Sequence, residues 1–154
     1  MHKEQHTELI ISRTFDVLRA LVWQARTDRG HIMQWWGPGG FSNSACESDL
    51  RIGGGFHLNM CGPDGNSYPC KGSFREIVKP ERLVYDSKAD DSHSCGAGLP
   101  PRSRVAITFT EQDNKTTFIL HTRFESVACK DAANQAGYSI SWGQVLARLG
   151  DHLH

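Results

Sequence analysis

Apolar and polar residues alternate in the central part of the chain, and a period of two is typical of strands that bury one face. The alternation is clearest in residues 56–61, 105–109 and 118–124. Residues 8–15 are rich in β-branched side chains and predict a further strand near the N-terminal end. With the weaker patterns included, strands are expected at residues 8–15, 42–50, 56–61 and 67–78, from residue 83, and at 105–109 and 118–124.

Two short stretches after the first predicted strand have apolar residues at helical spacing. Residues 17–26 predict one helix with Asp16 as its cap, and Asp28 is the expected cap of the second helix. The second helix should end at residues 37–40, because this Gly-Pro-Gly-Gly segment cannot continue a helix at low cost. The expected apolar faces are Val17, Leu21, Val22 and Ala25 in the first helix, and Ile32, Trp35 and Trp36 in the second.

The C-terminal part of the chain predicts the longest helix, residues 127–152, with Ser126 as its cap. One stripe along this helix consists of Tyr138, Trp142, Leu146 and Leu149. Antiparallel strands followed by a helix are typical of the α+β class. Because a strongly bent sheet cannot fill its own concave side, we expect the stripe to lie there. Residues 88–103, which include Asp90, Asp91 and two adjacent prolines, predict a loop over the end of the sheet.

Composition and charge narrow the classes of function. A chain of 154 residues predicts one domain, residues 1–154 with a core of about 8–153. Seventeen basic residues balance seventeen acidic ones, which argues against nucleic-acid binding. The sequence has no secretory signal and no apolar run long enough to span a membrane. Five cysteines without a Cys-x-x-Cys pair favour free thiols in the cytoplasm over disulfides or a zinc site.

Five segments stand in the order and spacing of one known family. They are Val22–Asp28, Trp35–Pro38, Asp49–Gly54, Gly62–Gly65 and Arg75–Val84. Through them the chain resembles the bacterial proteins similar to the activator of the heat-shock-protein-90 ATPase, within the START-like or Bet v 1-like (SRPBCC) superfamily. The resemblance implies a helix-grip fold, in which a curved antiparallel sheet of six or seven strands surrounds a long C-terminal helix. It also implies a cavity between them that binds a lipid, polyketide or aromatic compound.

Apolar and aromatic residues on the inward faces of the predicted strands and last helix are the candidate ligand site. They are Trp36, Phe56, Leu58, Met60, Tyr68, Phe74, Tyr85, Phe109, Tyr138 and Trp142. The same side chains would also serve to fill a close-packed core, so both interpretations remain open. His57 and His121 are out of phase with the apolar faces of their strands and are expected to face solvent.

Binding of an apolar small molecule is the leading hypothesis for function. One alternative is a protein that regulates a chaperone ATPase by direct contact, as the family name suggests. A second alternative is an enzyme similar to polyketide cyclases or dehydratases, with Tyr68, Tyr85 or Tyr138 donating a hydrogen bond to the substrate. The sequence has no nucleotide-binding motif and no metal-ligand spacing, so we expect no cofactor, no metal and no catalytic residue of a recognised type.

Overall fold

The computed structural model of the protein describes residues 7–37, 39–88, 102–135 and 137–154. In these residues a seven-stranded antiparallel sheet has the strand order β1-β7-β6-β5-β4-β3-β2. The strands are β1 (Glu8–Phe15), β2 (Ser42–Ser48), β3 (Gly55–Cys61), β4 (Ser67–Val78), β5 (Arg82–Lys88), β6 (Arg102–Gln112) and β7 (Lys115–Phe124). The helices are α1 (Arg19–Thr27), α2 (Arg29–Trp35), α3 (Val127–Gln135) and α4 (Tyr138–Leu153). The predicted α+β class and all predicted strands are confirmed.

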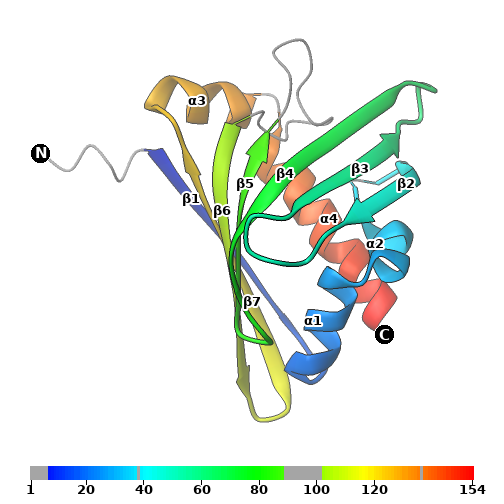
Figure 1. Ribbon diagram of the computed structural model, residues 1–154, viewed down its shortest axis with the longest axis vertical. Helices are drawn as coiled ribbons and strands as arrows, with labels where there is room; N and C mark the ends of the chain where they lie inside the picture. Colours follow the sequence, from blue (N-terminus) through cyan, green and yellow to red (C-terminus); the bar gives the residue numbers. More distant parts are fainter. Residues whose placement is uncertain (1–6, 38, 89–101, 136) are drawn as a thin grey trace, which may run out of the picture.

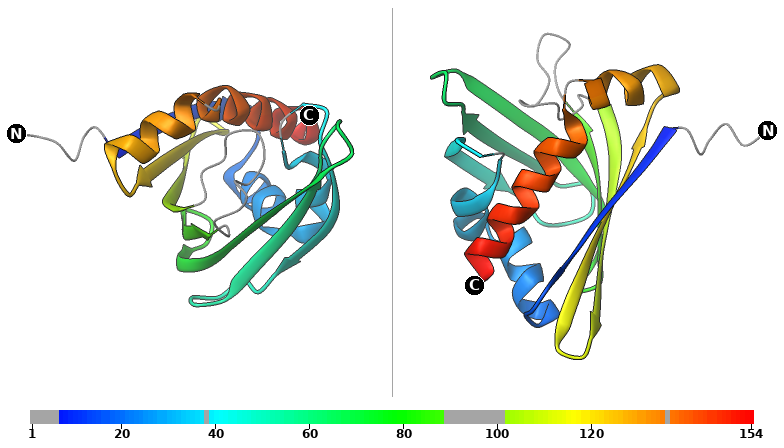
Figure 2. Two further views of the ribbon diagram at one scale, coloured as in Figure 1. Left: turned by 90° about the horizontal axis from the view of Figure 1, so that it is seen from above. Right: turned by 180° about the vertical axis from the view of Figure 1, so that it is seen from behind.

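The sheet curves around α4, which lies across its concave side (Figures 1 and 2). The short helices α1 and α2 lie beside the C-terminal half of α4 and close one end of the concavity (Figure 2). One cluster of buried apolar side chains draws residues from every helix and strand. The predicted stripe of α4 is confirmed, because Tyr138, Trp142, Leu146 and Leu149 are all buried.

The last helix differs from its prediction, because residues 127–152 are not one continuous helix. The chain forms α3 and then α4, and Gly137 between them has a φ of 95°. This left-handed backbone conformation is open to glycine at little cost and ends a right-handed helix. At the start of α3 the predicted cap is confirmed, since the Ser126 Oγ accepts a hydrogen bond from the Cys129 N–H at 3.1 Å.

The predicted start of α1 is also wrong. The helix begins at Arg19 and not at residue 17, and Asp16 does not cap it. Two contacts from the sheet explain the later start. The Thr116 hydroxyl donates a hydrogen bond to the Val17 carbonyl at 2.8 Å, and Glu111 accepts one from the Arg19 N–H at 2.8 Å. A carboxylate on β6 therefore satisfies a free N–H at the helix start.

The second short helix is capped as predicted. The Asp28 carboxylate accepts hydrogen bonds from the Gly30 and His31 N–H groups. The helix ends at Trp35, so Trp36 already has extended backbone. The loop predicted over residues 88–103 lies for the most part outside the described residues.

Candidate ligand-binding site

The ten predicted lining residues come from the segment after α2, four strands and α4. Eight of them are at most 4% exposed, whereas Phe56 and Tyr68 are partly exposed. The other five strand residues are therefore in the core, whereas Phe56 and Tyr68 lie nearer the rim of the concavity. The side chains do not form a single group: their ring contacts define a tryptophan pair and a group on the sheet, and three residues lie apart from both. Leu58 and Met60 are buried on β3.

The centre of the site is a pair of tryptophans. The rings of Trp36 and Trp142 meet edge to face, with centroids 5.6 Å apart and an interplanar angle of 88°. Within the described part of the chain, the buried Trp36 indole N–H has no hydrogen-bond acceptor. The Trp142 N–H lacks one at full hydrogen-bond geometry, but the Trp142 side chain lies near enough to the Tyr138 hydroxyl to lower its pKa. The neighbouring Trp35 differs, because its N–H donates to the Ala25 carbonyl at 2.9 Å. Trp35 thus ties α2 to α1, while Trp36 keeps a buried, unused donor.

Polar contacts hold the segment after α2 in place. Arg148 on α4 donates hydrogen bonds to the carbonyls of Trp36 and Gly37, at 3.2 and 2.9 Å. The Asn43 amide on β2 donates to the Trp36 carbonyl at 3.0 Å. The Trp36 backbone is therefore fixed from both α4 and the sheet, which positions its indole ring over the concavity.

A second group lies on the sheet itself. Phe56 packs against Phe74 and Tyr85, with ring centroids 5.3 and 5.2 Å away. Gly72 stands opposite Phe56 in the β3–β4 pair. A Cβ at Gly72 would lie closer than 3.0 Å to the Phe56 ring and to the Asp86 carbonyl, so only glycine fits here. The missing side chain makes room for the Phe56 ring on the sheet.

Three predicted residues lie apart from these groups. Phe109 packs against Trp23 of α1 and Phe118 of β7, so its ring contacts serve the packing of α1 on the sheet. Tyr68 lies at the rim, where its hydroxyl donates a hydrogen bond to Asp64. That bond raises the pKa of Tyr68 and lowers the pKa of Asp64.

Tyr138 forms a buried hydrogen bond with Thr122. Burial raises the pKa of Tyr138 far above its ordinary value, and the bond to Thr122 only partly offsets this effect. Its phenol is therefore neutral at physiological pH. The hydroxyl is already paired with Thr122, so it is less free than the Trp36 N–H to bond a guest.

Arg26 is the residue that sequence analysis missed. Its side chain is 5% exposed, and its guanidinium lies over the rings of Trp36 and Tyr85, 5.1 and 5.3 Å from their centroids. Helical spacing could have predicted its burial, because Arg26 follows the buried Val22 by four residues and so lies on the same face of α1.

A small space lies beside Arg26. It has a volume of about 10 Å³, enough for one water molecule, and is lined by Arg26, Thr27, Ile32, Cys46, Ser48, Leu50, Phe56, Leu58 and Phe74. Burial raises the pKa of the Cys46 thiol, and the positive charge of Arg26 acts against that shift. The thiol is therefore neutral at physiological pH.

A histidine pair joins α2 to the end of α4. The Nδ1 of His31 and the Nε2 of His152 are 2.8 Å apart in a hydrogen bond. Burial, followed by the charge of His31, lowers the pKa of His152 below its ordinary value of 6.5. The unfolded chain therefore binds more protons than the folded one in the range just below pH 6.5.

We expect the free energy of unfolding to fall as the pH is lowered from about 7 to 5, by less than about 1 kcal/mol, because solvent reaches both rings. Urea denaturation across this range measures the effect. The variant His152→Gln keeps a hydrogen-bonding group but cannot titrate, so its stability should fall less over the same range. An identical pH dependence in both proteins would contradict the assignment.

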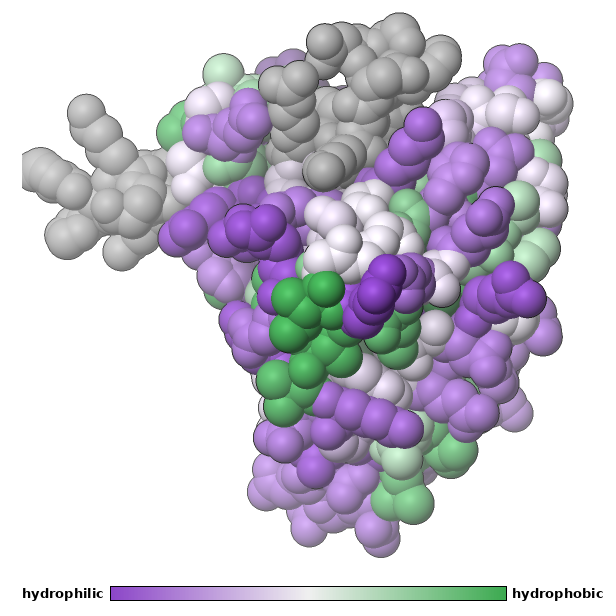
Figure 3. Space-filling view, in the orientation of Figure 1, coloured by the Kyte–Doolittle hydropathy of each residue, from purple (hydrophilic) through white to green (hydrophobic). Residues whose placement is uncertain are grey.

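The convex face of the sheet is mainly hydrophilic, with a group of apolar residues near the middle of the view (Figure 3).

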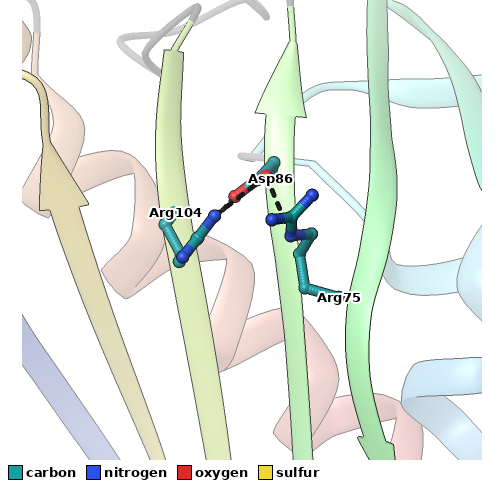
Figure 4. Close-up of polar contacts among 3 residues, drawn as sticks. All are labelled: Arg75, Asp86 and Arg104. Carbon is teal, nitrogen blue, oxygen red and sulfur yellow. Dashed lines mark hydrogen bonds and ion pairs between the residues drawn. The ribbon is translucent and has the colours of Figure 1, made fainter. Parts of the chain in front are cut away.

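Asp86 on β5 lies between two arginines (Figure 4). Its carboxylate is 2.8 Å from the Nε of Arg104 and 3.4 Å from the Nε of Arg75. Both arginines are about half exposed, so these ion pairs add little stability. A shallow hollow of about 330 Å³ beside them has mostly polar and charged walls. His121 also faces outward, as predicted, and pairs with Glu8.

The described residues contain neither a cluster of metal ligands nor a helix that could span a membrane. In the residues with assigned positions, no three His, Cys, Asp or Glu side chains gather closely enough to hold a metal ion. No helix of this part of the structure is long and apolar enough to cross a membrane.

Comparison with known proteins places the chain among relatives of similar length. Residues 16–154 match the family described as "Activator of Hsp90 ATPase homolog 1-like protein". No curated protein sequence matches the chain.

Several solved structures resemble this protein over most of its length. A protein from Nitrosomonas europaea is 25% identical, with a TM-score of 0.85 over 96% of this chain and 94% of its own. The AHSA1 protein of Silicibacter pomeroyi is 22% identical, with a TM-score of 0.72 over 95% and 96% of the two chains. CalU16 from Micromonospora echinospora is 24% identical, with a TM-score of 0.68 over 95% of this chain and 75% of its own.

Proposed function

The chain belongs to the family of activator of Hsp90 ATPase homolog 1-like proteins, and we propose that it binds an apolar small molecule on the concave side of its sheet. The helix-grip fold of this family suits either ligand binding or a co-chaperone role. The ligand-binding proposal places the guest between the tryptophan pair and the aromatic group of β3, β4 and β5. Trp36, Trp142, Phe56, Phe74 and Tyr85 are its central contacts.

The observation that carries the proposal is the buried Trp36 indole N–H, which has no acceptor among the described residues. Leaving a buried donor unsatisfied costs roughly 1–3 kcal/mol, so a core selected only for stability would avoid it. A guest with an oxygen acceptor beside Trp36 would satisfy this donor and bury its apolar part against the sheet. The unused donor thus favours a binding site over a simple core.

A guest needs more room than the space of about 10 Å³ beside Arg26. Phe56 and Leu50 line this space, and Phe56 is partly exposed and Leu50 exposed, so both side chains can move outward without opening the centre of the core. We therefore place the entrance between the end of α1 and the turn that follows β2. The tightly packed α4 side of the concavity then stays in place during binding.

A thermal-shift screen tests the proposal with fatty acids, flavonoids and polyketide-like aromatic compounds. A ligand at 100 times its Kd stabilises the folded protein by about 2.7 kcal/mol, which corresponds to a rise in Tm of roughly 5–10 °C for a chain of this size. We expect at least one class of compound to give such a shift. If no compound raises the Tm and none quenches tryptophan fluorescence, the proposal is wrong.

Two variants of adjacent tryptophans provide a matched control. Trp36→Phe removes a donor that has no partner, so we expect weaker ligand binding and only the loss of stability that the smaller buried ring causes. Trp35→Phe shrinks a buried ring in the same way and also removes the hydrogen bond to Ala25, so we expect it to lose about 1 kcal/mol more stability, with unchanged affinity. Equal effects of the two variants on affinity would argue against a specific role of Trp36.

The family description favours one alternative, the stimulation of a chaperone ATPase. Leu50, Ile52 and Val78 are exposed apolar side chains that a protein partner would cover. The ATPase rate of an Hsp90-type chaperone, measured with and without a saturating amount of this protein, separates the two functions. An increased rate together with a negative ligand screen would replace the proposed function by this one.

A further inference from the structure

Arg26 has the most unusual environment of any charged group that the structure describes. It is the one buried ionisable side chain of Lys, Arg, Asp or Glu among these residues, and its Nε has no acceptor there. No described carboxylate forms an ion pair with it. Two aromatic rings flank its guanidinium, but ring faces offer only about 0.5–2 kcal/mol. A buried charge without a counter-charge costs several kcal/mol, and none of the described residues gives Arg26 a partner of comparable strength.

The position of Arg26 joins it to the candidate ligand site. Its guanidinium lies over Trp36, whose own N–H is unused, and over Tyr85, which packs against Phe56. The small space beside it is bounded by the apolar side chains of Leu58 and Phe74. Arg26 therefore borders this space and also lies over the ring of Trp36, which is not itself among the residues that line the space.

We propose that the ligand of this protein is an apolar molecule with one carboxylate, and that Arg26 pairs with this carboxylate. The inference rests on the proposed function, because it names the chemical class of the guest in the same site. The guanidinium presents its N–H donors in a planar fork that matches the two oxygens of a carboxylate. The Arg26 guanidinium lies 5.1 Å from the centroid of the Trp36 ring, whose N–H is a second donor without a partner in the same region. The apolar remainder of the ligand lies against Leu58 and Phe74.

Charge balance selects a carboxylate over other acceptor groups. One arginine neutralises one negative charge, whereas a phosphate monoester carries close to two at neutral pH and would leave a buried charge in excess. A neutral alcohol or amide would accept a hydrogen bond but would leave the guanidinium charge unbalanced. Because Arg26 supplies one positive charge beside apolar side chains, both fatty acids and aromatic carboxylic acids are suitable ligands.

The experiment compares two pairs of compounds that differ only at the polar end. The pairs are dodecanoate with dodecan-1-ol, and anthracene-2-carboxylate with 2-anthracenemethanol. Binding to the wild-type protein and to Arg26→Met is measured by calorimetric titration and by quenching of tryptophan fluorescence. Methionine keeps much of the length of the arginine side chain without its charge, and Arg26→Lys keeps the charge without the fork.

We expect the wild-type protein to bind the carboxylate of at least one pair ten or more times as tightly as the alcohol. In Arg26→Met this preference should disappear through weaker carboxylate binding, while the alcohol keeps its affinity within about threefold. Arg26→Lys should retain part of the preference. If Arg26→Met does not fold, the comparison within each pair on the wild-type protein still decides the question.

The possible failures are distinguishable. Equal binding of carboxylate and alcohol to the wild-type protein overturns the role of Arg26 but leaves the proposed function standing. A preference for the carboxylate that persists in Arg26→Met also overturns the role of Arg26 and leaves the proposed function standing. If neither member of either pair binds and the wider screen is negative, the proposed function falls and the inference falls with it.

Discussion

Replacing Trp142 with alanine is expected to lower the free energy of unfolding by about 3–5 kcal/mol. Trp142 belongs to the buried stripe of α4 and is 3% exposed. Its indole packs edge to face against Trp36, so truncation removes this contact and leaves a large cavity in the core. The loss is large because the surrounding strands are paired on both sides and cannot collapse into the space.

Urea denaturation followed by circular dichroism measures the change. The matched control is Ile140→Ala on the same helix, because Ile140 is 71% exposed and its truncation should change stability by less than about 0.5 kcal/mol. Similar losses in the two variants would contradict the packing of α4 described above. A loss below 1 kcal/mol in Trp142→Ala would have the same consequence.

Adding a single methyl group at Gly72 is expected to cost about 3 kcal/mol or more, at the upper end of the range for overpacked cores. The Cβ of Gly72→Ala would collide with the Phe56 ring and with the backbone carbonyl of Asp86. The ring can turn away, but the carbonyl belongs to the paired strand β5 and cannot move without breaking the β4–β5 ladder. Displacement of the Phe56 ring should also weaken ligand binding, and a titration of the ligand into the same variant would measure this effect.

Gly143→Ala is the control for this substitution. Gly143 lies inside α4, and a Cβ there meets no atom within 4 Å. Alanine in a helix interior is favoured over glycine by roughly 0.5–1 kcal/mol, so this variant should be more stable than the wild-type protein. If Gly72→Ala were as stable as the wild-type protein, the close approach of β4, β5 and Phe56 would be wrong.

Local patterns explain most of what could be predicted. The alternation in residues 56–61 and 118–124 is a property of a strand with one buried face, and it needs no knowledge of the strand's partner. Asp28 and Ser126 act as helix caps through N–H groups within three residues of them, so their roles are also local. The stripe that contains Trp142 follows from the helical period alone.

Contacts between distant segments explain the differences. The start of α1 was misplaced because Glu111 and Thr116, about a hundred residues away, hold its first residues. Leu21 was assigned to the buried face of α1, but it is 51% exposed. The helix instead buries Trp23 against Phe109 of the sheet. A short helix has a weak periodic signal, so the surface on which it packs decides its orientation.

The sequence by itself determined the class of fold, the strands, the buried stripe of α4 and the set of aromatic residues available to a ligand, because each depends on residues close together in the chain. Only the tertiary structure decided how those aromatics are grouped. It separated Trp36, whose N–H is unused, from Trp35, whose N–H is bonded. It also placed Arg26 between the rings of Trp36 and Tyr85. Burial and hydrogen bonding depend on every segment that surrounds a group, and no local pattern contains that information.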